Sequence, residues 1–494
     1  MKLQQLLAGS EVASITGPSA LEIVSIECDS RKVSPGGIFF ALHGAKLEGA
    51  RFVADALERG AVAIASESPG PPDFPRDLAW IELLPGTDRK ALAVAAANFY
   101  GRPADALQLA AVTGTNGKTT TTYLVDSILR AAGCITGLIG TTGYRTPRGQ
   151  RDAANTTPES LELQRMFAEI RDARGTHATL EASSHALAMD RLWGCHFAAA
   201  IFTNLTRDHL DYHHTFESYF EAKRRLFEGT GAGAPDTAVI NADDPYAAEL
   251  LGLAPRTLTY GLKTPADLAP KQLTLSPEGL QFTAQTPAGE MEVRSPLVGR
   301  MNTYNILAAI GAGIALGISV SHVERGIAQL ASVPGRFERI DEGQPFLVVV
   351  DYAHTDDALR NVISTARDLS PSARIITVFG AGGERDRTKR PLMGEAAGSL
   401  SDLVVLTSDN PRSEDPLRII NDVAVGLQKA NAKYRTNPDR EQAIATAIEA
   451  ARPGDIVVLA GKGHETYQVL RDGPIDFDDR EKARAILRGK GYGK

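Results

Sequence analysis

Residues 111–121 read Ala111-Val112-Thr113-Gly114-Thr115-Asn116-Gly117-Lys118-Thr119-Thr120-Thr121, directly after an apolar run that begins at Leu107. The order of the pattern is a strand, a glycine loop and the start of a helix. Such a loop turns backbone N–H groups toward a phosphate, and the new helix adds the positive end of its dipole. Lys118 supplies a mobile cation and Thr119 a hydroxyl for Mg²⁺. The sequence therefore predicts a nucleoside triphosphate site.

The loop is shorter than the usual phosphate-binding loop. That motif has a glycine five residues before Gly117, where this chain has Val112. We interpret the stretch as a shortened variant; the alternative is a glycine-rich turn that only closes a core strand.

Composition limits the class of protein. With 494 residues, and about 150 residues per domain, we expect three domains. The net charge of -7 provides no general attraction to nucleic acid or to a membrane surface. Three scattered cysteines and the absence of a signal-like first segment favour a cytoplasmic protein. The uncharged stretch 306–321 is too short to span a bilayer, and we expect a buried helix packed closely on a sheet.

Strand-like runs alternate with helix-period segments, which is typical of an α/β protein with mostly parallel sheets. Residues 346–350, 374–379, 403–406 and 456–459 form four such runs, each followed by polar residues or glycine. We predict a small α/β domain over 1–88, a central nucleotide-binding domain over 89–333 and a Rossmann-like domain over 334–494. Functional loops should lie at the carboxyl ends of the strands.

Two further segments place polar side chains after central strands. One run ends at Glu181, and the strand 199–202 leads into a segment that contains His209. Oxygen ligands beside a triphosphate loop suit Mg²⁺, so Glu181 and His209 are metal candidates. The alternative for His209 is a packing or hydrogen-bonding role. Lys223 lies in a helix-period segment beside two arginines, where spacing alone favours a solvated basic face.

The third segment combines groups of both charges. Arg385 and Arg412 can form forked hydrogen bonds with a carboxylate, whereas Asp409 and Glu465 can accept from an ammonium group. Together they predict an amino-acid pocket, although each motif alone is also typical of a turn.

These blocks, in this order, resemble the Mur ligases of bacterial cell-wall synthesis. The resemblance rests on Thr113-Gly114-Thr115-Asn116-Gly117-Lys118-Thr119-Thr120, Glu181-Ala182-Ser183-Ser184-His185, Asp208-His209-Leu210-Asp211-Tyr212-His213 and Asp409-Asn410-Pro411-Arg412. It implies a first domain that holds uridine diphosphate, a central ATP domain and a third domain that brings an amino acid.

The resemblance also implies roles for individual residues. ATP would be bound by Gly114, Thr115, Asn116, Gly117, Lys118, Thr119, Thr120, Asn302, Asn305, Arg336 and Asp351. The UDP-muramoyl dipeptide would be bound by Ser30, His43, Asn155, Thr156, Thr157, Ser183 and Arg191. The family often has glutamine where this chain has Met189.

In the family a lysine matching Lys223 becomes carbamylated, which turns an amine into a metal ligand. The implied metal ligands are Thr119, Glu181, His209 and the Lys223 carbamate, and the implied catalytic residues are Lys118, Lys223 and His209. The amino acid would be held by Arg385, Asp409, Asn410, Pro411, Arg412, Gly461 and Glu465. Asp356 stands where the family usually has proline.

The implied reaction uses ATP and Mg²⁺ to join meso-diaminopimelate to the D-glutamyl γ-carboxylate of UDP-N-acetylmuramoyl-L-Ala-D-Glu through an acyl phosphate. Arg412 favours diaminopimelate over L-lysine because it can recognise the second carboxylate. Alternatives are a lysine-adding member, a folylpolyglutamate synthase-like ligase and, in another class, a nucleotide-switched binding module. We expect a monomer that binds no nucleic acid and does not insert into a membrane.

Overall fold

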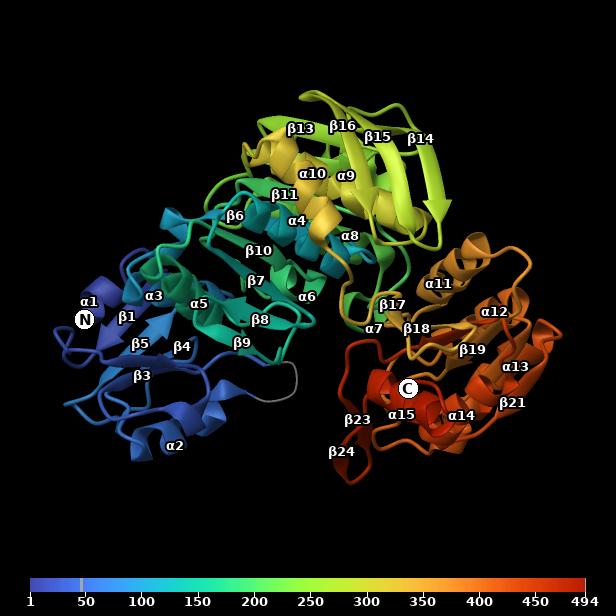
Figure 1. Ribbon diagram of the computed structural model, residues 1–494. Coiled ribbons are helices and arrows are strands. Elements are labelled where there is room, and N and C mark those ends of the chain that lie inside the picture. The colour runs from blue at the N-terminus through green and yellow to red at the C-terminus, as the bar shows by residue number, and fades with distance from the viewer. Residues whose placement is uncertain (45–47, 494) are drawn as a thin grey trace.

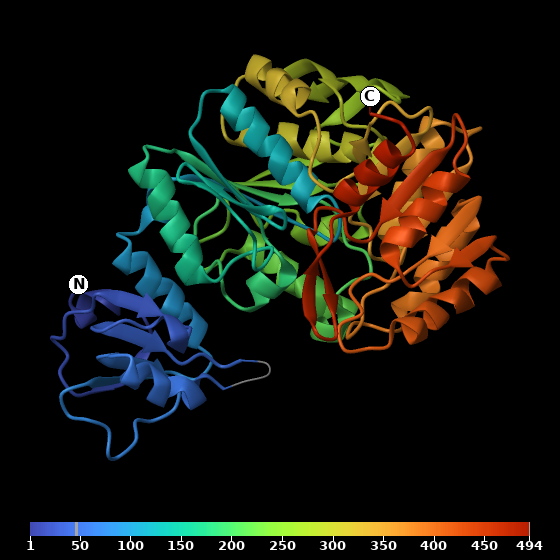
Figure 2. The same cartoon turned by 60° about the horizontal axis from the view of Figure 1, so that its bottom comes forward.

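The structure is a computed structural model that describes residues 1–44 and 48–493. It has a three-domain α/β fold in which the central domain lies between the other two (Figures 1 and 2). No helix in the described ranges is long and apolar enough to cross a membrane.

The N-terminal domain is built on a five-stranded sheet in the order β1-β5-β4-β3-β2, and only the β1–β5 pair is antiparallel. Helix α3 supplies Ala91, Leu92 and Ala95 to the core of this domain. The elements are α1 (Leu3–Leu6), β1 (Val12–Thr16), β2 (Ser25–Glu27), η1 (Ser30–Lys32), β3 (Gly37–Phe40), η2 (Gly49–Phe52), α2 (Val53–Glu58), β4 (Ala63–Ser66), β5 (Ala79–Leu83) and α3 (Asp88–Phe99).

The central domain has an eight-stranded sheet in the order β13-β12-β11-β6-β10-β7-β8-β9, parallel except for the pairs that β8 makes. Its strands are β6 (Gln108–Thr113), β7 (Thr136–Gly140), β8 (Gly143–Thr146), β9 (Gly149–Arg151), β10 (His177–Glu181), β11 (Ala199–Phe202), β12 (Thr237–Asn241) and β13 (Arg256–Tyr260). A separate antiparallel sheet contains β14 (Ala269–Ser276), β15 (Gly279–Thr286) and β16 (Gly289–Ser295).

Helices cover both faces of the central sheet. They are η3 (Pro103–Ala106), α4 (Lys118–Ala131), α5 (Ser160–Asp172), α6 (Ser184–Ala188), α7 (Leu210–His213), α8 (Phe216–Glu228), η4 (Pro245–Leu250), α9 (Arg300–Ala315) and α10 (Val320–Gln329). Alternate residues of β6 enter two cores: Leu109 packs on the α5 and α8 side, and Val112 on the α4 and α9 side. The buried helix expected near residue 306 is confirmed as α9, where a Cβ on Gly311 would lie 2.6 Å from Val239.

The C-terminal domain has a six-stranded sheet in the order β17-β18-β22-β19-β20-β21, in which only β17 is antiparallel. The elements are β17 (Glu338–Ile340), β18 (Leu347–Asp351), α11 (Asp356–Leu369), β19 (Ile375–Phe379), α12 (Lys389–Leu400), β20 (Leu403–Leu406), α13 (Pro416–Lys429), β21 (Tyr434–Thr436), α14 (Arg440–Ala450), β22 (Ile456–Ala460), β23 (Tyr467–Leu470), β24 (Gly473–Asp476) and α15 (Asp479–Gly489). The four strands that the apolar runs predict are all present. The β23–β24 hairpin lies on the side of this domain that faces the N-terminal domain (Figure 1).

Candidate active site

The glycine loop joins β6 to α4, as the sequence predicts. Gly117 has a φ of +89° and is the N-cap of α4, and a Cβ there would lie 2.5 Å from Asn305 Oδ1. At Gly114 a Cβ would lie 1.9 Å from Thr203 Oγ1. Both positions therefore need glycine, because neighbouring side chains fill the space that a Cβ would take.

Lys118 bends back over the loop that precedes it. Its Nζ donates to the carbonyl oxygens of Gly114, at 3.0 Å, and Thr115, at 2.8 Å. Burial lowers the pKa of Lys118, while the carboxylates of Glu181 and Asp208 oppose this shift. The ammonium group therefore lies at the mouth of the loop, where a phosphate would replace neutral carbonyl oxygens with a charged partner.

The central and C-terminal domains form one cleft around this loop. Arg336 donates from Nη2 to Thr119 Oγ1 at 2.9 Å, so the C-terminal domain reaches the first turn of α4. The residues predicted to bind ATP that line the cleft are Thr115, Asn116, Gly117, Lys118, Thr119, Thr120, Asn302, Asn305, Arg336 and Asp351. Gly114 lies behind them and presents its carbonyl oxygen to Lys118 and Lys223.

Lys223 is buried, with 1% of its surface exposed, so the solvated face that spacing alone favours is wrong. Its Nζ donates to the Gly114 carbonyl oxygen at 2.8 Å and lies 4.4 Å from the centre of the Tyr219 ring. Burial, together with the charge of Lys118, holds the pKa of Lys223 well below its usual range. The arrangement favours an uncharged amine at this position.

The other metal candidates line the same cleft. Glu181 is buried at the end of β10 and accepts hydrogen bonds from the Thr141 N–H, at 2.8 Å, and the Thr141 hydroxyl, at 3.0 Å. His209 has a φ of +54°, and its ring lies 3.4 Å from Asp208 Oδ2. Burial lowers the pKa of His209, so the ring is neutral and able to bind a metal near pH 7.

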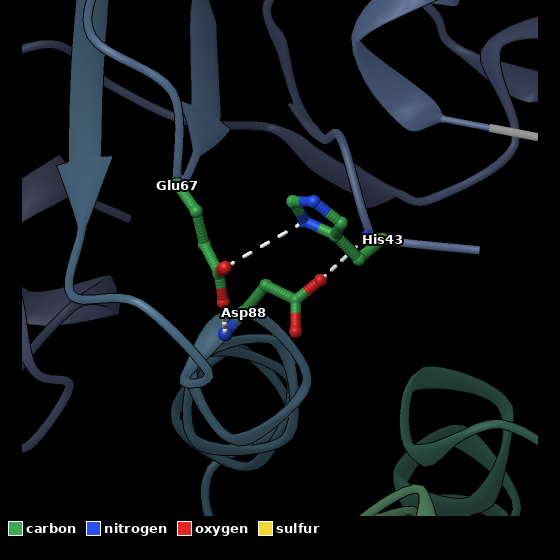
Figure 3. Close-up of side chains that lie close together, drawn as sticks. All are labelled: His43, Glu67 and Asp88. Atoms are coloured by element: carbon green, nitrogen blue, oxygen red, sulfur yellow. Dashed lines mark hydrogen bonds and ion pairs between the residues drawn. The ribbon is translucent and has the colours of Figure 1, made fainter. Parts of the chain in front are cut away.

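Within residues 1–44 and 48–493, the only group of three close His, Cys, Asp or Glu ligand atoms lies elsewhere, at His43, Glu67 and Asp88 (Figure 3). Asp88 Oδ2 accepts from the His43 N–H at 2.6 Å, and Glu67 Oε1 accepts from the N–H groups of Thr87 and Asp88. These carboxylates therefore fix the start of α3 and the segment that carries His43.

The residues predicted for the muramoyl dipeptide fall into two places. Thr157 Oγ1 donates to the Glu181 carbonyl oxygen at 2.6 Å, and its carbonyl oxygen accepts from Arg191 at 2.8 Å. Ser183 bonds to Thr157 and caps α6, and Thr156 lines the cleft beside Thr141. Asn155 lies exposed in the same segment. The structure thus brings Thr156, Thr157, Ser183 and Arg191 together beside Glu181, whereas the Asn155 backbone bonds to the Tyr144 hydroxyl.

Ser30 and His43 lie in the N-terminal domain and line neither this cleft nor the amino-acid pocket. The hydroxyl of Ser30 is already bonded to Asp55 Oδ2 at 2.7 Å. Near Arg191, Met189 occupies the position where the resemblance predicts glutamine, and its sulfur lies 3.7 Å from Arg191 Nη2.

A second cleft contains the predicted amino-acid pocket. It is lined by Arg385, Asp409, Asn410, Arg412, Gly461 and Glu465, and also by Asp356. Pro411 lies against Gly383, where a Cβ would lie 2.0 Å from the proline carbonyl oxygen. Arg412 has a φ of +55°, and its Nη1 donates to the Gly383 carbonyl oxygen at 2.6 Å. The arginine is therefore held by its backbone and by one side of its guanidinium group.

Sequence reasoning missed several residues that line these clefts or support them from behind. Lys462 is fully buried and donates to Glu465 Oε2 at 2.9 Å and to Asn410 Oδ1 at 3.2 Å. Asp208 and His354 line both clefts. Asp208 stands in a block that the sequence singles out, and Lys462 and His354 lie within three residues of the predicted site residues Gly461 and Asp351, whereas no local pattern distinguishes Tyr219.

Comparisons with known proteins identify the class. The descriptions "Mur ligase family, catalytic domain", "Mur ligase middle domain" and "Mur ligase, glutamate ligase domain" match residues 22–100, 112–313 and 335–463. The chain belongs to the Mur ligase family.

Particular relatives resemble the whole chain. It is 54% identical over 495 residues to the UDP-N-acetylmuramoyl-L-alanyl-D-glutamate--2,6-diaminopimelate ligase of Solibacter usitatus (strain Ellin6076), covering 100% of this chain and 99% of the relative. The ligase of the same name from Geobacillus thermodenitrificans (strain NG80-2) is 46% identical, with 99% of each chain covered.

Solved structures show the same architecture. A UDP-N-acetylmuramoyl-L-alanyl-D-glutamate--2,6-diaminopimelate ligase superimposes with a TM-score of 0.68 and 35% identity, covering 100% of this chain and 99% of the other. A Mycobacterium tuberculosis folylpolyglutamate synthase, solved with ADP and AMPPCP, shares the fold with a TM-score of 0.61 at 19% identity over 75% of this chain and 91% of its own.

Proposed function

We propose that the chain is an ATP-dependent ligase that joins meso-diaminopimelate to UDP-N-acetylmuramoyl-L-Ala-D-Glu. The main observation behind this proposal is that the nucleotide cleft and the amino-acid pocket meet, because five residues line both of them. These residues are Thr156, Asp208, His209, Tyr352 and His354. A phosphorylated carboxylate formed in the first cleft can then be attacked by an amine held in the second. The full-length likeness to ligases of this name supports the choice of substrates.

The reaction has two steps. The γ-phosphate of ATP passes to the D-glutamyl γ-carboxylate, which gives an acyl phosphate and ADP. The amine of diaminopimelate then attacks the acyl carbon, and inorganic phosphate leaves as the amide forms. Lys118 stabilises the charge that develops on the transferred phosphoryl group. Because an acyl phosphate hydrolyses in water, we expect the C-terminal domain to cover the site during chemistry.

Mg²⁺ would be held by Thr119, Glu181, His209 and a carbamate on Lys223. The donor set fits this ion, since a buried carboxylate, a hydroxyl and a neutral imidazole line the cleft beside the phosphate loop. The uncharged Lys223 amine is the form that reacts with carbon dioxide. When bound, Mg²⁺ would neutralise charge on the phosphates.

Ser30 and His43 would contact the uridine nucleotide from the N-terminal domain. We propose that the enzyme acts as a monomer. We assign the enzyme to the cytoplasm.

Substrate choice rests on Arg412. Meso-diaminopimelate carries a second carboxylate that L-lysine lacks, and leaving the rest of the half-buried Arg412 guanidinium without that partner costs on the order of 1–3 kcal/mol. We therefore expect the second-order rate constant, kcat/KM, to be at least about tenfold higher for diaminopimelate than for L-lysine.

A phosphate-release assay tests the proposal. Wild-type protein should release phosphate only when ATP, the UDP-muramoyl dipeptide and meso-diaminopimelate are all present. Arg412→Lys should lower kcat/KM for diaminopimelate by about 10- to 100-fold, and Arg418→Lys, an exposed arginine on α13, is the matched control.

Three outcomes would contradict the assignment. Equal rates with L-lysine would remove the argument from Arg412 and favour a lysine-adding ligase. Release with a folate and glutamate would favour the synthase. Release from ATP and water alone would favour a nucleotide-switched module.

A further inference from the structure

The junction of the two clefts contains few groups able to accept a proton. Of the five residues that line both clefts, Asp208, His209, Tyr352 and His354 titrate, and Thr156 does not. An amino acid enters such a site as an ammonium ion, whereas attack on an acyl phosphate requires the free amine. The proposed reaction therefore needs a base at this junction, and the sequence does not identify one.

Three of the titratable groups are already engaged or unsuited. Asp208 directs Oδ1 to the His209 N–H, at 2.9 Å, and Oδ2 to the His209 ring, at 3.4 Å. His209 belongs to the proposed metal ligands. Burial raises the pKa of the Tyr352 phenol, so this side chain stays protonated and is a poor acceptor.

His354 is held with one ring nitrogen free. It follows β18 and precedes Thr355, the N-cap of α11, so the backbone on both sides is fixed. Its Nδ1 lies 2.8 Å from the Tyr352 carbonyl oxygen. Because a carbonyl oxygen only accepts, Nδ1 carries the hydrogen, and the lone pair of the neutral ring is on Nε2. This is the one hydrogen bond of His354 in the part of the chain that the structure describes.

We propose that His354 is the general base that removes a proton from the amino group of the incoming amino acid. The inference rests on the proposed function. In the step, the amine nitrogen bonds to the acyl carbon, and the bond from that carbon to the phosphate oxygen breaks, with its electron pair leaving on phosphate. Two protons leave the nitrogen overall. His354 Nε2 takes one from the ammonium group before attack and passes it to solvent, and the second, lost as the amide forms, goes to the departing phosphate.

The charges around His354 set the direction of its pH response. Burial lowers the pKa of His354, and Lys389 of α12 acts in the same direction. Asp208 and Asp409, which face it from the central domain and from the segment after β20, oppose that shift. Arg385, Asp356 and Glu465 also line the pocket beside it. The ring is therefore a free base at neutral pH, and amide formation should be lost as pH falls through its lowered pKa.

Separating the two steps of the reaction tests this role. In His354→Gln and His354→Asn, acyl phosphate formation is followed by exchange of labelled ADP into ATP, with the UDP-muramoyl dipeptide and Mg²⁺ present. The acyl phosphate is also trapped with hydroxylamine, which is largely uncharged at pH 7 and needs no base. His196→Gln, an exposed histidine of the central domain, is the matched control.

We expect exchange and hydroxamate formation to stay within about twofold of wild type, while amide formation with diaminopimelate falls by about 100-fold. The loss should shrink as pH rises, because more of the amino acid is then a free amine. An equal loss in all three assays, or no loss of amide formation, would overturn the role of His354. Wild-type protein that shows no exchange with the UDP-muramoyl dipeptide would contradict the proposed function instead.

Discussion

Lys223 is the residue whose chemistry departs most from its place in the sequence. It is buried on α8, and its hydrogen bond goes to a carbonyl oxygen. Because its lowered pKa favours the free amine, carbon dioxide can add to nitrogen with loss of one proton and leave a carboxylate-like group. We expect Lys223→Ala to lower phosphate release by at least about 100-fold, as for loss of a group that stabilises the transition state.

Short carboxylates provide the diagnostic for Lys223. Formate or acetate should restore part of the activity of Lys223→Ala, because either can enter the space that the side chain leaves and supply the missing oxygen ligand. Lys271→Ala, which removes an exposed lysine paired with Glu290 on the β14–β16 sheet, should match wild type with and without the acids. Full activity of Lys223→Ala, or no rescue by either acid, would contradict the carbamate.

At the scale of elements, the β23–β24 hairpin supports the amino-acid pocket. Gln468 is buried and donates to the Asp409 carbonyl oxygen at 2.6 Å. Next to it, the Val469 N–H donates to Asn410 Oδ1 at 2.9 Å, and the Val469 carbonyl oxygen accepts from the Arg412 N–H at 3.0 Å. The hairpin therefore holds the segment that carries the proposed specificity arginine.

We expect Gln468→Leu to raise the KM for diaminopimelate about tenfold and to leave the KM for ATP within twofold of wild type. The KM for diaminopimelate should rise because the buried Asp409 carbonyl oxygen loses its hydrogen-bond donor, at a cost of about 1–3 kcal/mol. The KM for ATP should not change because this site lies far from the phosphate loop. Steady-state kinetics with each substrate varied in turn measure both constants. Gln428→Leu, an exposed glutamine of α13, serves as the control. An equal rise in both KM values would contradict a local role of the hairpin.

The sequence predicts the elements that local pattern controls. The apolar runs that end before Asp351, Asp409 and Gly461 become β18, β20 and β22, because parallel strands buried on both faces need continuous apolar residues. Gln468 gives no such signal, since its partner lies 59 residues away along the chain. The pattern of charged residues around Lys223 predicts a solvent-exposed helix face. Such a local pattern carries no information about the other parts of the fold that cover that face.

At the scale of the whole molecule, Asp357 joins the two domains that form the nucleotide cleft. Its Oδ2 accepts from Asn116 Nδ2 of the phosphate loop at 2.7 Å and from the Thr206 hydroxyl at 3.2 Å. Hydrogen bonds to a carboxylate are worth about 1.5–3 kcal/mol each, so Asp357→Ala should open the cleft and raise the KM for ATP roughly tenfold.

Small-angle scattering should show that Asp357→Ala has a larger radius of gyration than wild type without nucleotide. The difference should shrink when a non-hydrolysable ATP analogue bridges the domains. Asp368→Ala, at the exposed end of the same helix α11, should change neither quantity. If Asp357→Ala matches wild type in both the KM for ATP and the radius of gyration, other contacts hold the domains together. The hydrogen bond from Arg336 to Thr119 is then the next contact to remove by mutation.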